Sequence, residues 1–522
     1  MAFLESPESY PHRPTEVRAI QTHISWVFIA SPFVFKVKKP LNLGFLDFST
    51  LQKRRYYCRR EIELNRRLCP EVYLDSVPIY EAGAGFSFKP SGDVVEYAVQ
   101  MRELPHGWFL SELLKKNLVG EKEINRVIST LHRFYQAETP TDEIEQWGTP
   151  EKLKISTDEN FTQVEPFIGK TISITVFEAI RHYTNQFYKL NQKLFRKRIH
   201  RIVDCHGDLH LDHVHLTPEA TTIFDCIEFN DRFRFIDVAN DLAFLAMDFD
   251  FEDRSDLGNL FLRNAARQLA DAGMMGITDF YKCYRAFVRG KVESIQAAEK
   301  ETANRQEYQK HAARYFRLAL RYAIAGSEPL VLIVMGRVGT GKSTIAKRLA
   351  GELRWPAFSS DEIRKRLACL PLTQRTPLEL REKIYSERVT QQTYTKLLEE
   401  GLAAVKNNPG VIVDATFSTG ALRKFLHDGC KKANAPYQFV ELEIDSAEIK
   451  KRLKARNENT AEASDARVED FQKLTAAYEP PSELGPHLIR VSTTTSAADA
   501  VKTILLRLAE RQVVGTDFRP VR

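Results

Sequence analysis

Cysteine is scarce in this chain of 522 residues, and it forms neither a disulfide pattern nor a metal-binding pattern. The cysteines number seven, are scattered along the chain and include no pair in C-x-x-C spacing. They are Cys58, Cys69, Cys205, Cys226, Cys283, Cys369 and Cys430. We therefore expect neither a disulfide framework nor a thiolate zinc site.

Long apolar runs are also missing from the sequence. The longest, residues 329–335, has the length of a strand and falls far short of the ~18 residues that cross a bilayer. The first residues, MAFLESPESYPHRP, lack the apolar core of a signal peptide. We therefore expect a cytoplasmic protein with no membrane partner.

A strong charge of one sign is absent as well. Lysine and arginine number 75 against 69 aspartates and glutamates, which leaves a net charge of +6. Proteins that bind polyanions usually carry a larger basic excess, so we do not expect a nucleic-acid partner. The oligomeric state cannot be read from these features.

The composition that is present is that of a globular protein, with 43% hydrophobic and 28% charged residues. The length allows two or three domains. A charged, helix-like stretch ends at Gly326-Ser327-Glu328-Pro329, and the buried-strand pattern VLIVM follows directly. This break predicts an N-terminal domain over residues 1–326 and a C-terminal domain over residues 327–522.

The two predicted domains differ in their pattern of elements. In the first, strand and helix patterns come early, and mostly helical patterns follow from about residue 120. The early patterns are a hairpin over 24–39 with a Ser31-Pro32 turn, a helix over 51–68 and a strand over 94–104. This order predicts a bilobal α+β domain. The second domain alternates strand and helix, which predicts an α/β domain with a parallel sheet.

The second domain contains a phosphate-binding motif. Residues 336–343, GRVGTGKS, fit G-x-x-x-x-G-K-[ST] at every required position, between a strand pattern and an amphipathic helix pattern. Glycines let backbone N–H groups turn towards phosphate oxygens, and the helix N-terminus adds its positive end. The predicted ATP contacts are Gly336, Gly339, Thr340, Gly341, Lys342, Ser343 and Thr344. Among them Lys342 would reach the β- and γ-phosphates, and Ser343 would bind Mg²⁺.

Four residues downstream complete the predicted C-terminal site. Asp414 ends the buried strand VIVD, where an unpaired charge is costly, so we expect it to act on Mg²⁺ through water. Asp361 follows a short strand and can accept the proton of an acceptor hydroxyl, while Arg364 can bind an anionic substrate. Helix capping by Ser360 or Asp361 is the alternative. Arg456 suits a lid over the phosphates, and a solvated helix face is the alternative there.

Residues 329–510 resemble the small P-loop kinases, namely gluconate and shikimate kinases, chloramphenicol phosphotransferase, zeta-type toxins and polynucleotide kinase. The resemblance rests on GRVGTGKS, SSDEIR, VIVDATF and RLKAR. It implies a P-loop NTPase fold, with Asp361 as the catalytic base and Arg456 as the lid arginine. These families phosphorylate very different hydroxyls, so the resemblance does not identify the acceptor.

The first domain carries a second set of residues suited to phosphoryl transfer. Asp208 lies in CHGDLH and Asp225 follows in TTIFDCI, each after a short strand pattern. Phosphoryl transfer needs one carboxylate near the acceptor hydroxyl and another on the metal ion. Lys36 on a strand and Glu61 on a helix can form a pair that positions the α- and β-phosphates. Lys38 lies on the same strand face as Lys36 and is a rival for that role.

Residues 20–300 resemble the aminoglycoside phosphotransferase-like branch of the protein-kinase fold. HGDLHLDH matches the family motif HGDLH-x-x-N. The resemblance implies that Asp208 is the catalytic base, Asp225 the metal-binding aspartate and Lys36–Glu61 the ion pair. It also makes the strand EYAVQMREL, with Met101, a hinge that contacts the nucleotide. Asp237 and Asp241 match further acidic positions, where we expect capping or bonding of the catalytic loop.

One position departs from that family, because His213 stands where the family has its metal-binding asparagine. Imidazole is a poorer ligand than an amide oxygen for a hard ion such as Mg²⁺. Three alternatives follow: the metal is held through water, Mn²⁺ is accepted, or the activity is weakened. We keep His213 among the predicted metal-site residues.

Together these motifs predict a bifunctional, ATP- and Mg²⁺-dependent phosphotransferase. Each domain would transfer the γ-phosphoryl group to a hydroxyl of a small molecule, such as a sugar or a sugar-like metabolite. Two alternatives remain open. In one, the first domain is a ligand-binding pseudokinase that regulates the P-loop kinase. In the other, the protein is an RNA- or nucleotide-end kinase.

Overall fold

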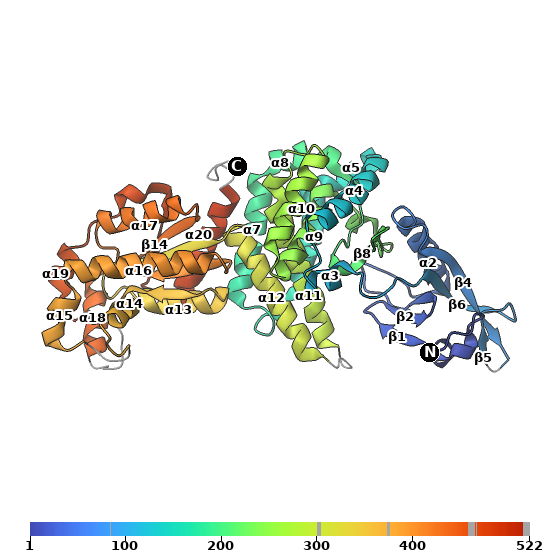
Figure 1. The fold of residues 1–522 in the computed structure, drawn as a ribbon, viewed down its shortest axis with the longest axis horizontal. Coiled ribbons are helices and arrows are strands. Elements are labelled where there is room, and N and C mark those ends of the chain that lie inside the picture. The colour runs from blue at the N-terminus through green and yellow to red at the C-terminus, as the bar shows by residue number, and fades with distance from the viewer. Residues whose placement is uncertain (84, 300–303, 373–375, 458–464, 466, 515–522) are drawn as a thin grey trace. The chain divides into compact units, whose positions relative to one another are not determined.

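The protein is described by a computed structural model that covers residues 1–522 except 84, 300–303, 373–375, 458–464, 466 and 515–522 (Figure 1). The side chains of Leu378, Arg456 and Asn457 are also outside the described part. The chain forms two compact units. Unit 1 comprises residues 1–166 and 191–315, and unit 2 comprises residues 167–190 and 316–522.

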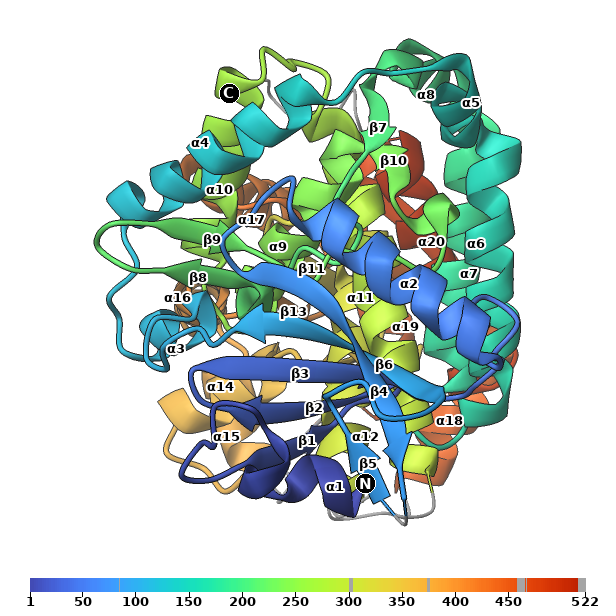
Figure 2. The ribbon, with the colours of Figure 1, turned by 90° about the vertical axis from the view of Figure 1, so that its right-hand side faces the viewer.

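Unit 1 contains an antiparallel six-stranded sheet in the order β1-β2-β3-β6-β4-β5. The strands are β1 Arg18–Gln21, β2 Ser25–Ala30, β3 Phe33–Lys38, β4 Tyr73–Ala82, β5 Gly85–Ser87 and β6 Val94–Arg102. Ala30 pairs with Phe33, which confirms the hairpin predicted around Ser31-Pro32. Helix α2 (Leu51–Asn65) packs on β4 and β6 and crosses one face of the sheet in Figure 2.

The rest of unit 1 is mostly helical, as its sequence predicts. Two short antiparallel pairs lie in it, formed by β7 (Ile202–Asp204) with β10 (Phe235–Asp237) and by β8 (Val214–Leu216) with β9 (Thr221–Ile223). Its helices are α1 Ala2–Glu5, α3 Leu110–Lys115, α4 Glu121–Ala137, α5 Asp142–Glu145, α6 Pro150–Val164, α8 Gln192–Lys197, α9 Val238–Phe251, α10 Ser255–Gln268 and α11 Met275–Ala298. Helix α12 (Arg305–Ile324) begins in unit 1 and ends in unit 2.

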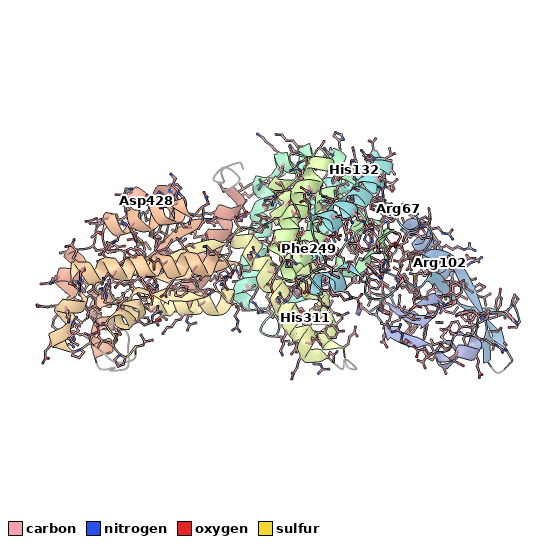
Figure 3. The ribbon with its side chains drawn as sticks, viewed as in Figure 1. Arg67, Arg102, His132, Phe249, His311 and Asp428 are labelled. Carbon is pink, nitrogen blue, oxygen red and sulfur yellow. The ribbon has the colours of Figure 1, made fainter. Side chains whose placement is uncertain are left out.

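Helix α9 is the centre of this helical part, because every one of its residues is buried. Phe249, labelled in Figure 3, lies among the surrounding helices and packs against Phe261 of α10. A helix without an exposed face serves as a core element, and its buried polar residues must find partners within the protein. It therefore gives the loops at its N-terminal end a rigid support.

Unit 2 contains a five-stranded parallel sheet in the order β12-β13-β11-β14-β15. Its strands are β11 Leu330–Met335, β12 Ala357–Ser359, β13 Gly410–Asp414, β14 Tyr437–Glu443 and β15 Leu488–Ser492. The helices are α7 Ile174–Leu190, α13 Lys342–Leu353, α14 Ser360–Leu367, α15 Leu378–Ile384, α16 Glu387–Val405, α17 Gly420–Lys432, α18 Ser446–Asn457, α19 Phe471–Ala476 and α20 Ala497–Val514. Every residue of β11 is buried, as a central parallel strand requires, so the predicted α/β fold of this region is confirmed.

Helix α7 belongs to unit 2 although it lies far upstream in the sequence. Its apolar face packs on α20, and α20 in turn packs on α13 and β15. Around the apolar contact, Glu178 pairs with Lys502 at 2.5 Å and His182 lies 3.2 Å from Glu510. The domain boundary at residue 327 stays a prediction, because unit 2 includes residues 167–190 and 316–326, which precede that boundary.

Among the described residues, no helix has the length and apolar character needed to cross a membrane.

The place of α7 predicts that a substitution at residue 180 weakens unit 2. Ile180 is 1% exposed on α7, so Ile180→Ala should lower the free energy of unfolding of unit 2 by about 2–5 kcal/mol. Hydrogen exchange should locate the lost protection in β11, β13 and α20. Ile174→Ala is the matched control, because Ile174 lies on the same helix and is 51% exposed. Weakening of the six-stranded sheet alone would contradict the prediction.

Candidate functional site

In unit 1, two lysines and three carboxylates form one network in which each charge lies next to charges of the opposite sign. Lys36 Nζ lies 2.9 Å from Glu61 Oε1 and 2.6 Å from Asp225 Oδ1. Lys38 Nζ lies 2.6 Å from Glu61 Oε2 and also binds Glu228. Both lysines of β3 therefore reach Glu61 of α2 and are neighbours in one network.

The same network fixes the protonation of its members. Burial alone would lower the pKa of Lys36, but the carboxylates of Asp225 and Glu61 outweigh it and raise that pKa well above its usual value. Burial alone would raise the pKa of Glu61, but Lys36 and Lys38 lower it. Glu61 is fully buried, so its carboxylate depends on both lysines for compensation.

The backbone at Asp225 adopts a left-handed conformation, with φ = 63°. Residues other than glycine adopt it rarely and at a cost in energy, so the surroundings must hold it. The Asp225 N–H donates to Tyr73 Oη at 3.2 Å, and the next N–H, of Cys226, donates to Asn65 Oδ1 at 2.8 Å. The sheet and the end of α2 thus hold the Asp225 carboxylate towards Lys36.

The loop that carries Asp208 is held by Asp241 at the start of α9. The Asp241 carboxylate accepts hydrogen bonds from the backbone N–H groups of His206 and Gly207, each at 2.9 Å, and from Tyr135 Oη at 2.9 Å. Gly207 has φ = 85°, and a Cβ there would lie 2.8 Å from the Phe233 carbonyl oxygen. The predicted structural role of Asp241 is therefore confirmed.

Asp237 also has the structural role expected of it. Its carboxylate accepts from the N–H of Ala239 at 2.8 Å and so caps α9. Both of its oxygens also accept from Arg198, at 2.6 and 2.8 Å. This pair fixes the direction in which α9 begins.

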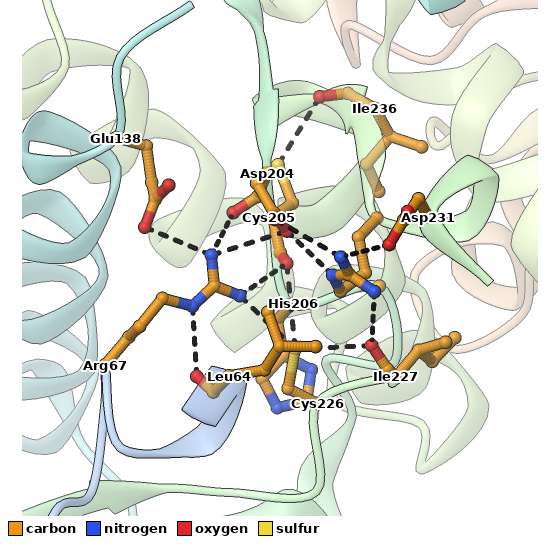
Figure 4. A network of polar contacts seen from close by, with 12 residues as sticks. Leu64, Arg67, Glu138, Asp204, Cys205, His206, Cys226, Ile227, Asp231 and Ile236 are labelled. Atoms are coloured by element: carbon orange, nitrogen blue, oxygen red, sulfur yellow. Dashed lines mark hydrogen bonds and ion pairs between the residues drawn. The ribbon is translucent and has the colours of Figure 1, made fainter. Parts of the chain in front are cut away.

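A further arginine connects α2 to the strand before the Asp208 loop (Figure 4). Arg67, two residues after α2, donates from Nη1 to the Asp204 carbonyl oxygen at 3.0 Å and to Glu138 at 3.1 Å. Arg234 donates to the Asp204 carboxylate at 2.7 Å. The helix that carries Glu61 and the loop that carries Asp208 are thus joined through Asp204.

Histidines surround the Asp208 carboxylate. His213 Nδ1 donates to the Asp208 carbonyl oxygen at 2.9 Å, and its Nε2 lies 3.5 Å from Asp225 Oδ2. His210 Nε2 lies 3.6 Å from Asp208 Oδ2, and the rings of His210 and His213 have centroids 3.8 Å apart. Asp208, His210 and His213 each offer a metal-ligand atom within 4.8 Å of the others.

These histidines also affect the ionisation of Asp208. Burial alone would raise the pKa of the Asp208 carboxyl, but His210 and His213 lower it well below its usual value. Burial lowers the pKa of His213 to about 4. The site therefore combines an ionised carboxylate with a neutral imidazole near pH 7.

Met101 lies in an apolar cluster beside this charged network. It is buried at the end of β6, pairs with Val34 and Tyr73, and packs in an apolar cluster with Cys58 and Val99. Its predicted contact with the nucleotide stays a prediction.

In unit 2 the glycine-rich loop connects β11 to α13. Gly336, Gly339 and Gly341 have φ values of 139°, 82° and 94°. A Cβ at Gly336 would lie 2.6 Å from the Leu442 carbonyl oxygen, and one at Gly339 would lie 2.9 Å from Ile449 Cγ2. Both glycines are therefore required by close packing as well as by conformation.

The residues that follow the loop differ in exposure. Thr340 is fully buried, and its Oγ1 donates to the Arg337 carbonyl oxygen at 2.9 Å. Ser343 and Thr344 are exposed in the first turn of α13, and Lys342 Nζ lies 3.1 Å from the Arg337 carbonyl oxygen. Thr340 thus stabilises the loop, while the exposed hydroxyls remain accessible to a ligand.

Ser343 and Asp414 form the predicted oxygen-donor pair. Ser343 Oγ donates to Asp414 Oδ2 at 2.7 Å, where β13 ends beside β11. Burial raises the pKa of Asp414 to about 6, and Lys342 and the Ser343 hydrogen bond oppose this effect. A hydroxyl and a carboxylate are suitable ligands for Mg²⁺ and its water shell.

Asp361, Arg364 and Arg456 are the other predicted site residues of unit 2. Asp361 is half-buried in the first turn of α14. Arg364 is buried and donates to the Ile384 carbonyl oxygen at 2.7 Å and to Thr390 Oγ1 at 3.1 Å, so it joins α14 to neighbouring helices. The side chain of Arg456 is outside the described part of the structure. The ligand contacts of these residues stay predictions.

Several residues of these sites were not predicted. Glu228 contacts Lys38 and Arg67 contacts Asp204 across long stretches of sequence, whereas His210 lies only two residues from Asp208. Two local signals existed, namely the position of Glu228, three residues after Asp225, and the position of His210 within HGDLH. Such long-range contacts cannot be read from one sequence.

The chain is similar to known proteins over both units and over unit 2 alone. A family model described as "AAA domain" matches residues 331–481. An adenylate kinase of Chlamydia abortus is 24% identical over 205 residues, covering 33% of this chain and 94% of that protein. The assignment of a P-loop domain in unit 2 is therefore supported by the parallel sheet, by the GRVGTGKS motif and by the matching family model.

A solved gluconokinase structure from Sinorhizobium meliloti 1021 is 18% identical and covers 36% of this chain and 97% of its own. Its TM-score is 0.27.

Longer relatives occur in mycobacteria. The uncharacterized protein Rv2004c of Mycobacterium tuberculosis is 31% identical over 405 residues, which are 77% of this chain and 79% of that protein. The uncharacterized protein Mb2027c of Mycobacterium bovis matches with the same identity and coverage. At this identity and coverage, the chain belongs to the same family as these mycobacterial proteins.

Proposed function

We propose that the protein is an ATP-dependent phosphotransferase with one phosphoryl-transfer site in each unit. The observation that carries the proposal is the meeting of Lys36, Glu61, Asp208 and Asp225 in unit 1, in a chain that also has a P-loop in unit 2. Lys36 and Asp225 are separated by 189 positions and lie 2.6 Å apart. Phosphoryl transfer requires a lysine for the phosphates, a carboxylate for the metal ion and a base for the acceptor, and this network offers such groups together.

In unit 1, each charged residue has a distinct task. Lys36, held by Glu61, binds the α- and β-phosphates of ATP. Asp225 would hold a metal ion, which supplies charge neutralisation at the phosphates when bound. Asp208 accepts a hydrogen bond from the acceptor hydroxyl and takes its proton as the hydroxyl oxygen bonds to the γ-phosphorus and the bond to ADP breaks. Asp241 and His210 keep this carboxylate in position.

In unit 2, the loop of residues 336–343 binds the ATP phosphates through backbone N–H groups, and Lys342 neutralises their charge. Ser343 and Asp414 would hold Mg²⁺, which supplies charge neutralisation at the phosphates when bound. Asp361 is the proposed base for the acceptor hydroxyl, Arg364 the proposed substrate contact and Arg456 the proposed lid residue. The acceptor of each site is a small molecule with a hydroxyl group.

Single substitutions should separate the two activities. Asp208→Ala should lower the turnover of one class of acceptor by about 10²–10⁴-fold, because the acceptor proton loses its base. Lys342→Ala should abolish phosphorylation of the other class. The measurement is ADP release and product mass over a library of hydroxyl metabolites, with the unsubstituted protein as reference.

If Asp208→Ala leaves every product unchanged, unit 1 has no phosphotransferase activity. Binding of ATP to unit 1 in that case would identify a nucleotide-binding regulatory domain.

The close packing at the P-loop predicts the effect of Gly339→Ala. The added methyl group would lie 2.9 Å from Ile449 Cγ2 at a backbone φ of 82°, so the loop must shift. Calorimetric titration should show one ATP site per chain instead of two. Gly351→Ala is the control, since no atom lies within 4 Å of its added Cβ, and it should keep both sites. Two intact sites in Gly339→Ala would disprove the loop's role.

The raised pKa of Asp414 predicts that its metal-binding carboxylate lowers stability. The carboxyl binds its proton more tightly in the folded chain, so its contribution to stability is present below about pH 4 and is lost as the pH rises through about 6. Asp414→Asn should therefore stabilise ligand-free unit 2 at pH 8 by up to about 3 kcal/mol, a gain that vanishes near pH 4.

The measurement is thermal unfolding of both proteins from pH 4 to pH 8 without nucleotide. Asp428→Asn is the control, because Asp428 (labelled in Figure 3) is exposed and its pKa is lowered by Lys424. A variant that is less stable than the parent at pH 8 would contradict the prediction.

A further inference from the structure

The nitrogen atoms of the histidines beside Asp208 have different tasks. His206 Nδ1 accepts from the Asp208 N–H at 3.3 Å, and its Nε2 donates to the Phe224 carbonyl oxygen at 2.9 Å. His210 Nδ1 accepts from the Asp212 N–H at 3.4 Å, which leaves the hydrogen on Nε2, facing Asp208. Backbone contacts therefore fix the tautomer of each ring.

His213 has the opposite tautomer. Its Nδ1 lies 2.9 Å from the Asp208 carbonyl oxygen, a contact that requires the hydrogen on Nδ1. The Nε2 of the neutral ring then carries a lone pair, and it lies 3.5 Å from Asp225 Oδ2. A ring nitrogen with a lone pair and a carboxylate oxygen that face each other in this way are placed to share a cation.

The spacing suits a metal ion. Two adjacent ligands at about 2.1 Å from one ion lie about 3–3.5 Å apart, which matches the distance between His213 Nε2 and Asp225 Oδ2. The other oxygen of Asp225 is occupied by Lys36, so Oδ2 is the one that faces the imidazole. A carboxylate and a neutral imidazole, whose second nitrogen donates to a carbonyl oxygen, form a common arrangement of metal ligands.

The local charge also suits a divalent cation. In the alternating network, the carboxylates of Glu228, Glu61 and Asp225 face the ammonium groups of Lys38 and Lys36. One negative charge remains in this set, and the nearby Asp208 carboxylate adds a second that Arg289 partly offsets. A cation next to His213 would therefore meet a net negative charge.

We propose that His213 Nε2 and Asp225 Oδ2 bind a divalent transition-metal ion, of the class of Mn²⁺, in preference to Mg²⁺. The inference rests on the proposed function in that it concerns the same site. Imidazole nitrogen binds first-row transition ions well, whereas Mg²⁺ prefers oxygen ligands. Mn²⁺ also binds phosphate oxygens, so it remains compatible with ATP. Unit 2 offers oxygen donors at Ser343 and Asp414, so the two units differ in metal preference.

Electron paramagnetic resonance of Mn²⁺ tests the proposal on the full chain without nucleotide. The background is Ser343→Ala, which removes the metal-binding hydroxyl of unit 2. Pulsed spectra should show coupling between bound Mn²⁺ and a ¹⁴N nucleus, and this coupling should disappear in His213→Asn. Titration should show Mn²⁺ binding at least about tenfold weaker in His213→Asn. Mg²⁺ should displace Mn²⁺ more readily from that variant.

His200→Asn is the matched control, since His200 is an exposed histidine of the same unit that pairs with Glu145. It should leave the ¹⁴N coupling and the Mn²⁺ affinity unchanged. The pulsed spectrum of the background protein needs no change at His213, so misfolding of His213→Asn could not conceal the answer. Bound Mn²⁺ without ¹⁴N coupling, or no bound Mn²⁺, overturns the proposal.

The two proposals fail separately. If Asp208→Ala leaves phosphoryl transfer unchanged while Mn²⁺ shows coupling that depends on His213, the metal site stands and the proposed activity of unit 1 falls. If transfer depends on Asp208 and Mn²⁺ shows no such coupling, the metal inference falls and the activity stands.

Discussion

The burial of Glu61 between two lysines is the constraint on which unit 1 depends. A fully buried carboxylate is costly unless it is paired, and here Lys36 and Lys38 each bind one of its oxygens. Those lysines also bind Asp225 and Glu228, which follow β9. The sheet, α2 and the segment after β9 must therefore assemble together, since the absence of any one leaves a charge uncompensated.

Local patterns predicted much of the fold, because hairpins, helices and the P-loop are set by neighbouring residues. GRVGTGKS carries its own strand, loop and helix, and its Ser343 donates a hydrogen bond to Asp414. The hairpin around Ser31-Pro32 also follows from adjacent residues. In unit 1, HGDLH and the strand lysines indicated residues that the structure brings together, but not how the two lysines divide the contacts to Glu61.

The features that the sequence did not reveal depend on distant contacts. Arg67 contacts Asp204 across 137 positions, and nothing near Arg67 indicates that partner. Helix α7 looks like an ordinary amphipathic helix, and only its packing on α20 places it in unit 2. The tautomer of His213 is set by the Asp208 carbonyl oxygen, so its chemistry depends on the loop's shape rather than on the residue type alone.

The position of α7 also bears on how such a chain can evolve. The chain passes between the units after residues 166, 190 and 315. A single recombination near residue 327 would transfer the P-loop strand without α7, and it would leave the apolar face of α20 uncovered. Because α7 lies between the two segments of unit 1, replacing the segment that encodes unit 1 would also remove a helix of unit 2. This arrangement favours inheritance of both units as one gene.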